Sequence, residues 1–249
     1  MKKREERLVM GKGQYADDLE FAGMAHLVFV GSPHAHARIR SINTDKAMAL
    51  PGVVRVITGR DMVQHTHPLP VQANFKKPDW TWRLANVHAI PHDKVRWYGE
   101  PVAAVVAEDE QTARRAADLV EVVYDPLPVT GNALEALTPE SPKLYDDWED
   151  NKQVHLKFDF GDPDKAFELA DQTLRVTYRE GRVTGLPIEP RGCVAVYDGK
   201  NDELDMWGSF QTPFLARHNI AATMGMPEAK VRISAVDIGG AFGLKIHTW

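Results

Sequence analysis

A glycine-rich segment near the end of the sequence has the residue types that can bind an anion through the backbone. Residues 237–245 read Asp-Ile-Gly-Gly-Ala-Phe-Gly-Leu-Lys and follow a short strand-like run. Three glycines within five residues let the backbone approach a ligand closely and turn its amides toward negative charge. The segment fits neither GxxxxGK[ST] nor GxGxxG, the common phosphate-binding motifs. From the glycines alone, a tight turn between strands is the favoured interpretation.

Two polar segments earlier in the chain could serve the same site. Gln211 precedes Thr212 and Pro213, which predict the start of a helix, so its amide could contact a ligand there. Capping of that helix by Gln211 or Thr212 is an equally good interpretation. Glu189 and Arg191 place a carboxylate and a guanidinium two residues apart, which favours a structural ion pair.

Histidine and cysteine give weaker signals. His34 and His36 would share one face of an extended segment, as metal ligands do, but no third or fourth ligand lies nearby in the sequence. Cys193 stands beside Val194 and Val196, which favours a buried, inert thiol. With one cysteine the chain can neither form an internal disulfide nor ligate an iron–sulfur cluster by itself. No Ser/His/Asp order or pair of carboxylates suggests a catalytic centre.

The composition limits the classes of protein to which this chain can belong. The 249 residues are 43% hydrophobic and 26% charged, typical of one or two folded domains rather than a disordered chain. A net charge of −5 disfavours a general nucleic-acid binder. Glutamates dilute the basic run at residues 2–7, so we expect a solvated tail there. With no secretory pattern and no apolar run of about 18 residues, we expect a soluble, cytoplasmic protein without a membrane span.

Hydrophobic periodicity in the first half predicts alternating strands and helices. Strands are expected at 24–30, 53–58 and 102–107, with a further one starting near Ile39 and a short helix at 45–50. Asp109 should cap a helix reaching Val120, followed by a strand at 120–124. This strand-helix-strand unit predicts a mixed or parallel sheet. The region 62–91, rich in proline and histidine, is expected to be a long loop with solvated histidines.

A shift to Pro, Ser, Thr and acidic residues at 128–150 marks the best domain boundary. Beyond it, we expect helices at 163–170 and 213–224, and strands at 154–160, 172–183, 193–197, 204–209 and 231–235. The fold class is therefore expected to be α/β (α+β). The division is a domain at 1–130, a linker at 131–150 and a second domain at 151–249.

Ordered motifs across nearly the whole chain resemble one enzyme family. Three segments are similar to the α/β hammerhead domain that opens the large subunit of molybdenum hydroxylases: 8–18, 32–39 and 95–103. These enzymes are xanthine dehydrogenase, aldehyde oxidase and aerobic carbon monoxide dehydrogenase. Three later segments resemble the first portion of their molybdopterin-binding region: 185–192, 211–213 and 237–245. The resemblance implies a hammerhead domain at 1–130 and an incomplete molybdopterin-binding domain at 151–249.

The resemblance also implies roles for individual residues. Gly240, Ala241, Phe242 and Gly243 would bind the cofactor by offering backbone amides to the oxygen atoms of the molybdopterin and molybdenum centre. Gln211 matches the family glutamine beside the oxo or hydroxo ligand, so Gln211 and Phe242 would lie near molybdenum without ligating it. No catalytic residue is expected in this chain. In the family, the glutamate that acts as base lies in the C-terminal part of the large subunit, which these 249 residues do not include. His34 and His36 match a surface motif of the hammerhead domain.

The implied function is that of a molybdenum-dependent oxidoreductase acting on an aldehyde, an N-heterocycle or carbon monoxide. Its cofactor would be molybdopterin, with the cytosine dinucleotide form left open, while partner subunits would carry [2Fe-2S] clusters and FAD. The chain would be an N-terminal fragment or split subunit, inactive alone. It would join the remaining part of the subunit, an iron–sulfur subunit and an FAD subunit in an oligomeric complex. The alternative is a non-catalytic hammerhead subunit for assembly or docking.

Two departures from the family pattern concern the substrate and the loop. Lys245 is followed by Ile246, whereas the purine-oxidising branch has a substrate-binding glutamate at that place, which disfavours xanthine as substrate. Ala241 stands where a third consecutive glycine is usual in the family. Its methyl group limits how closely the backbone can approach a ligand.

Overall fold

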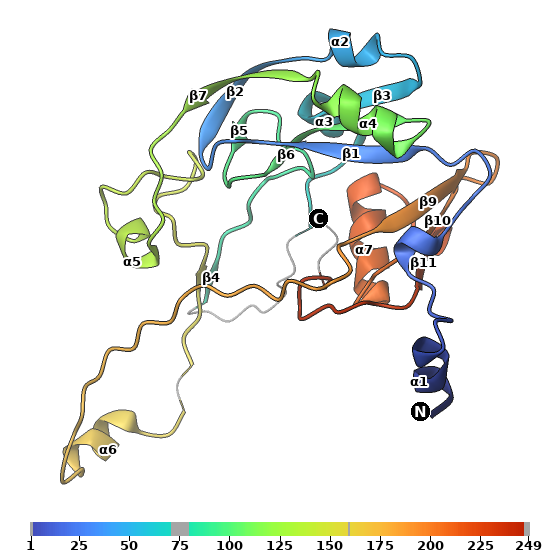
Figure 1. Ribbon diagram of the computed structural model, residues 1–249. Helices are drawn as coiled ribbons and strands as arrows, with labels where there is room; N and C mark the ends of the chain where they lie inside the picture. Colours follow the sequence, from blue (N-terminus) through green and yellow to red (C-terminus); the bar gives the residue numbers. More distant parts are fainter. Residues whose placement is uncertain (1, 71–79, 159, 247–249) are drawn as a thin grey trace.

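The computed structural model describes residues 2–70, 80–158 and 160–246 (Figure 1). Within these ranges the strands form three three-stranded sheets and one two-stranded sheet. Helices pack against the first and the third of the three-stranded sheets (Figure 1). This mixture of helices and strands confirms the expected α/β (α+β) class.

The first sheet is built around a strand that is buried on both faces. Its order is β1 (His26–Gly31), β6 (Pro101–Ala107), β3 (Val53–Thr58), and both pairings are antiparallel. Helix α4 (Glu110–Ala117) contacts β6 and β1. Asp109 caps this helix as predicted, since its Oδ1 accepts a hydrogen bond of 2.8 Å from the amide of Thr112.

The second sheet corrects the prediction of a mixed or parallel arrangement in this half. Its order is β5 (Lys94–Val95), β2 (Ala37–Asn43), β7 (Glu121–Pro126), and both of its pairings are antiparallel. Strand β6 already has β1 and β3 on its two edges, so β7 cannot pair with it and joins β2 instead. The short helix α2 (Asp45–Met48) contacts β3 of the first sheet.

The region expected to be a long loop contains regular structure. Helix α3 (Gly59–His65) is preceded by its N-cap residue Thr58, which forms a capping box with Asp61. Strand β4 (Thr81–Trp82) pairs with β8 (Val154–His155). Residues 71–79 of this region lie outside the described residues.

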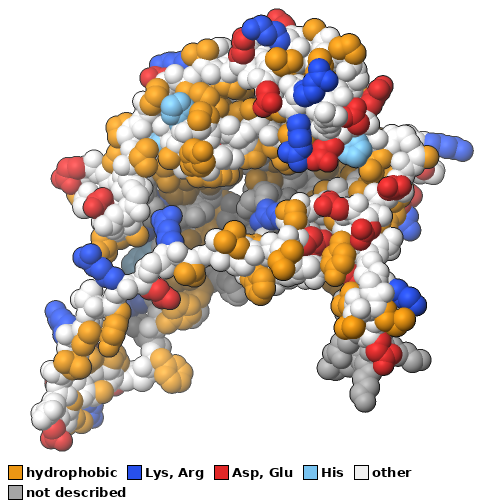
Figure 2. Space-filling view, in the orientation of Figure 1, with side chains coloured by type: hydrophobic (Ala, Val, Ile, Leu, Met, Phe, Trp, Pro, Cys, Tyr) orange, Lys and Arg blue, Asp and Glu red, His pale blue; other side chains and the backbone are white. Residues whose placement is uncertain are grey.

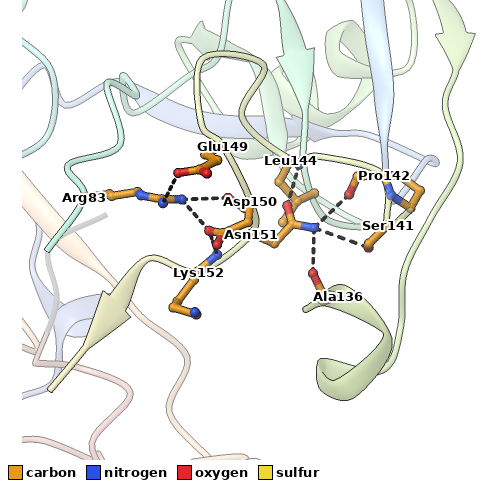
Figure 3. Close-up of polar contacts among 9 residues, drawn as sticks. All are labelled: Arg83, Ala136, Ser141, Pro142, Leu144, Glu149, Asp150, Asn151 and Lys152. Carbon is orange, nitrogen blue, oxygen red and sulfur yellow. Dashed lines mark hydrogen bonds and ion pairs between the residues drawn. The ribbon is translucent and has the colours of Figure 1, made fainter. Parts of the chain in front are cut away.

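The acidic and proline-rich segment between the two halves is folded onto the first half (Figure 3). It contains the short helix α5 (Ala133–Ala136). The Asn151 amide nitrogen donates to the carbonyl oxygens of Ala136 and Pro142 at 3.1 and 2.9 Å, and its Oδ1 accepts from the amide of Leu144. Arg83 forms an ion pair with Asp150. Asn151 therefore ties the segment together, whereas Arg83 and the Asp146 partners Lys94 and Arg38 hold it on the first half.

The third sheet lies in the second half and carries the glycine-rich segment at its end. Its order is β11 (Val231–Ala235), β10 (Glu203–Gly208), β9 (Cys193–Asp198); β10 and β11 are parallel, and β9 is antiparallel to β10. Helix α7 (Pro213–Met224) and the 3-10 turn η2 (Glu228–Lys230) connect the parallel strands. A cluster that includes Leu204, Ala221 and Val231 packs α7 on this sheet.

Cys193 is exposed, so the prediction of a buried cysteine is wrong. It begins β9, the edge strand of the third sheet, and edge strands are covered on fewer sides than central ones. Neighbouring atoms still desolvate the thiol and raise its pKa, which disfavours the thiolate form.

Between β8 and β9 the chain leaves the body of the molecule as an arm, residues 156–158 and 160–188, with helix α6 (Pro163–Glu168) near its tip (Figure 1). The expected helix is present. Of the expected strands at 154–160 and 172–183, only β8 is found among the described residues, and residue 159 lies outside them. A strand needs a hydrogen-bonded neighbour, and the described residues offer none to this arm.

The N-terminal residues lie against the third sheet rather than against the first two. Helix α1 (Lys2–Val9) is followed by the 3-10 turn η1 (Ala16–Asp18), which contacts β9. Arg7 forms an ion pair with Asp237, so the expectation of a solvated tail is wrong at this residue. None of the helices in the described ranges has the length and apolar character needed to cross a membrane.

Candidate functional site

The glycine-rich loop, residues 239–243, adopts a conformation that depends on left-handed backbone angles. The φ angles are +97° at Gly240, +48° at Phe242 and +86° at Gly243. Glycine tolerates such angles without steric cost, whereas Phe242 is a strained exception. Strain of this kind is retained only where the surroundings impose it, and it is concentrated at functional sites.

The amides of this loop are available to a ligand. Among the described residues, the four consecutive backbone N–H groups from Gly240 to Gly243 have no hydrogen-bond acceptor. The next amide, that of Leu244, donates to the Ala241 carbonyl at 2.8 Å, which closes the turn. Successive backbone amides without internal acceptors, in a turn that uses left-handed residues, can form a concave anion-binding site. A group rich in oxygen atoms, such as molybdopterin with its molybdenum centre, therefore fits these donors.

Glu189 fixes the start and the end of the loop at once. Its Oε2 accepts hydrogen bonds from the Gly239 amide at 2.7 Å and from Lys245 Nζ at 2.6 Å. The Lys245 side chain is 1% exposed and that of Glu189 is 13% exposed. Glu189 Oε1 is buried and has no hydrogen-bond partner among the described residues. The predicted ion pair between Glu189 and its neighbour Arg191 is therefore replaced by a pair with a residue 56 positions later.

Further hydrogen bonds hold the C-terminal side of the loop against the start of α7. Arg191 donates from Nε and Nη2 to the Leu244 carbonyl, at 2.9 and 2.6 Å. The amide of Gln211 donates to the Lys245 carbonyl at 3.0 Å, and the Thr212 hydroxyl donates to the Ile246 carbonyl at 2.9 Å. The structure thus brings Gln211 next to the glycine-rich loop, as the family resemblance implies.

The helix-capping interpretation of Gln211 and Thr212 is wrong. Thr212 occupies the N-cap position of α7, but no side chain caps the helix there. The Thr212 hydroxyl is instead bonded to the residue that follows Lys245. Gln211 is exposed, so its side-chain amide is free to meet a ligand.

Phe242 points away from the protein core and contacts the segment that precedes Glu189. The side chain is 73% exposed. A Cβ atom on Gly185 would lie 2.6 Å from Phe242 Cβ, and one on Gly240 would lie 3.2 Å from Pro187 Cβ. The loop and residues 185–187 therefore approach so closely that each needs a glycine at the contact.

Asp237 anchors the strand that delivers the loop, a role that sequence reasoning missed. Its Oδ2 accepts from the Gln14 amide at 2.8 Å, its Oδ1 accepts from Arg7, and its own amide donates to the Gln14 carbonyl at 2.9 Å. Both Gln14 and Asp237 lie within motifs of the family resemblance, which was the available signal. The N-terminal segment therefore supports the loop, although it is far from it in the sequence.

The histidine pair lies away from this loop and serves packing. His36 is 4% exposed and its Nδ1 lies 2.7 Å from the Pro128 carbonyl oxygen, so the surface position expected from the motif is wrong for this residue. The His34 ring packs edge-on against Tyr124. His88, expected to be solvated, is half-buried, and its pKa is lowered mainly by burial. Across the described residues, no group of three or more potential ligands could hold a metal ion.

Comparisons with known proteins agree with this arrangement. Residues 10–128 match the family model described as "Aldehyde oxidase and xanthine dehydrogenase, a/b hammerhead domain", and residues 145–249 match the "Molybdopterin cofactor-binding domain". The chain is 38% identical to the carbon monoxide dehydrogenase large chain of Afipia carboxidovorans and 33% identical to the nicotine 6-hydroxylase large subunit of Paenarthrobacter nicotinovorans. Both alignments cover 98% of this chain, and they cover 30% and 29% of those proteins.

Solved structures show the same likeness. The crystal structure of quinoline 2-oxidoreductase from Pseudomonas putida 86 superposes with a TM-score of 0.86 at 32% identity, covering 98% of this chain and 30% of that one. The chain thus spans about 30% of the length of the curated relatives named above. Two family models in the order expected from the motifs, with these relatives, show that the chain belongs to the aldehyde oxidase and xanthine dehydrogenase family and corresponds to the N-terminal part of its molybdenum hydroxylase large subunits.

Proposed function

We propose that this chain supplies one wall of the molybdopterin site in a molybdenum hydroxylase-type oxidoreductase of aldehyde, N-heterocycle or carbon monoxide type. The observation that supports this most directly is the row of four amides from Gly240 to Gly243 that lack acceptors among the described residues. When bound, the cofactor would supply the redox chemistry that oxidises a substrate carbon. The chain's own residues hold and orient that cofactor.

Each residue of the site has a defined task in this proposal. The amides of Gly240, Ala241, Phe242 and Gly243 donate hydrogen bonds to oxygen atoms of the cofactor. The exposed amide of Gln211 lies beside the same loop and orients a polar ligand of the metal without binding the metal itself. Phe242 covers the loop with a ring and excludes water from it. The chain adds no general base of its own in this proposal.

The partners and the location follow from the same proposal. The remaining part of the large subunit would complete the site, with an iron–sulfur subunit and an FAD subunit accepting the electrons, in the cytoplasm. The domain division at 1–130, 131–150 and 151–249 stays part of the proposal. The names of the relatives support a multi-subunit complex, since they are called a large chain and a large subunit.

The test measures cofactor content rather than turnover. The complex purified through this chain should contain molybdenum by elemental analysis and a fluorescent pterin after oxidation. Gly240→Ala should remove both molybdenum and pterin. A φ of +97° is strained for alanine, and the added methyl group would lie too close to Phe242 and Pro187. The matched control is Gly225→Ala, which has φ +66° at the end of α7 and carries a similar strain outside the loop. A complex free of molybdenum and pterin would refute the proposal and favour an assembly subunit.

A further inference from the structure

The returning limb of the arm, residues 173–188, carries large apolar side chains that nothing described covers. Leu174, Tyr178 and Val183 are 87%, 87% and 90% exposed. Figure 2 shows apolar side chains gathered along the arm that Figure 1 places outside the body of the molecule. Isolated apolar residues on a surface are ordinary, but a contiguous row of them marks an interaction surface.

The sequence of this limb has the pattern of a strand with one buried face. Leu174, Val176 and Tyr178 alternate with polar residues, Arg175 and Thr177 among them. Such a period of two places the apolar side chains on one face and the polar ones on the other. Among the described residues, the backbone of 173–188 forms no hydrogen bond with a neighbouring strand. The segment therefore lacks both partners that its pattern calls for, a strand at its edge and an apolar surface over one face.

A second copy of this chain fits the limb poorly. Because the pattern has a period of two, pairing two copies edge to edge with their apolar sides on one face would bring their polar sides together on the other face. Arg175 and Arg179 occupy that side, and no acidic residue stands between them. Two such rows would repel each other, and like charges opposite one another destabilise paired strands.

The rest of the large subunit fits it better. The limb lies inside residues 145–249, which match the molybdopterin cofactor-binding domain, while the chain covers only about 30% of its relatives. The limb is also followed directly by Glu189, whose carboxylate accepts hydrogen bonds from both sides of the glycine-rich loop. A strand that pairs with residues 173–179 would therefore be connected, through residues 180–188, to the carboxylate that supports the loop.

We propose that residues 173–179 become a β-strand by pairing with a strand from the remaining part of the large subunit, whether that part continues this polypeptide or belongs to another. Leu174, Val176 and Tyr178 are then buried in a shared core, and Arg175 and Arg179 face outward. The main-chain hydrogen bonds supply affinity, and the alternating side chains fix the register. The identity of the partner rests on the proposed function, whereas the pairing of the limb does not.

The experiment compares two neighbouring positions on opposite faces in the complex purified through this chain. A photo-crosslinking amino acid replaces Leu174 or, as the matched control, Arg175, and mass spectrometry identifies the crosslinked peptides. Leu174 should crosslink to the remaining part of the large subunit and Arg175 should not. Hydrogen exchange of the amides at 173–179 should be at least tenfold slower in the complex than in the isolated chain.

Two results would overturn the inference. One is fast exchange at 173–179 in the complex; the other is crosslinking of Leu174 to a second copy, to another subunit or to nothing. Cofactor content, measured on the same sample, separates this inference from the proposed function. Molybdenum and pterin with an unprotected limb would overturn only the pairing, and a paired limb without cofactor would overturn only the proposed function.

Discussion

Lys245 Nζ lies 2.6 Å from Glu189 Oε2, and this buried ion pair joins the end of the glycine-rich loop to the base of the arm. The same oxygen also accepts the amide of Gly239. One carboxylate therefore determines where the loop begins and where it ends. Of the five amides between these two points, that of Leu244 closes the turn onto Ala241, and those of Gly240 to Gly243 have no acceptor among the described residues.

Removing one partner of this pair should cost stability. In Lys245→Met, Glu189 keeps a buried negative charge without its cation, so the free energy of unfolding should fall by about 3 kcal/mol. Urea unfolding of the isolated chain measures this. The double variant Glu189→Gln with Lys245→Met should recover most of the loss, since no unpaired charge remains. The matched control is Lys46→Met, whose ion pair with Glu121 is exposed on both sides, where a change of at most about 1 kcal/mol is expected.

Sequence patterns predicted the elements that depend on local signals. Helix α7 has the bounds that the pattern predicts, because Pro213 starts it and Gly225 ends it in a left-handed conformation with φ +66°. The cap of α4 by Asp109 is likewise a contact between residues three positions apart. Signals of this kind depend on a few neighbouring residues, so they can be recognised in the sequence before the three-dimensional structure is known.

The predictions that failed depend on contacts between distant parts of the chain. The pattern at 172–183 is that of a strand, but only a neighbouring strand could make it one. A mixed or parallel sheet was expected because the β6-α4-β7 order permits it, yet strand β6 is already paired on both edges. Glu189 has a nearby arginine in the sequence and pairs with a lysine 56 positions away. The glycines predicted the loop itself, but the contacts of Glu189 and Asp237 that hold it could not be predicted, because they join residues far apart in the sequence.

A methyl group at Gly239 should disturb the support of the loop. Its Cβ would lie 2.6 Å from Glu189 Cβ, so Gly239→Ala must displace the carboxylate that holds the loop. We expect a loss of about 2 kcal/mol in the free energy of unfolding, together with lower molybdenum and pterin content in the complex. Gly199→Ala is the control, because its Cβ would meet its nearest neighbour, Tyr197, at an ordinary 3.7 Å. Equal stability of the two variants would contradict the contact.

Gln211 and Phe242 should matter for the cofactor and little for the fold. Both side chains are exposed, so Gln211→Ala and Phe242→Ala should each change the free energy of unfolding by about 0.5 kcal/mol or less. Molybdenum-dependent turnover of the complex should fall in both variants. Phe242→Gly is an informative companion, since it relieves the strain of φ +48° while removing the ring. If both alanine variants keep normal turnover, the site assignment is wrong.

Glu100 should make the stability of the first half depend on pH in an unusual direction. The side chain is buried, with 3% of the residue exposed, and burial raises its pKa from 4.5 to about 7, against the opposing hydrogen bond from the Arg96 amide. The folded state therefore binds more protons than the unfolded state between these two values. Its contribution to stability is complete below pH 4.5, falls as the pH rises toward about 7, and is lost above that.

The variant Glu100→Gln isolates this effect. Glutamine keeps an oxygen that can accept the Arg96 amide and removes the buried charge, so the variant should be more stable than the wild type at pH 8. The difference between 4.5 and about 7 corresponds to a gain on the order of 3 kcal/mol. Urea unfolding at pH 5 and pH 8 measures the gain, with Glu140→Gln at an exposed position as the control. Because His88 titrates in both proteins, its contribution cancels in the comparison. A gain that is equal at the two pH values would show that Glu100 is ionised in the folded state at pH 5, contrary to the raised pKa.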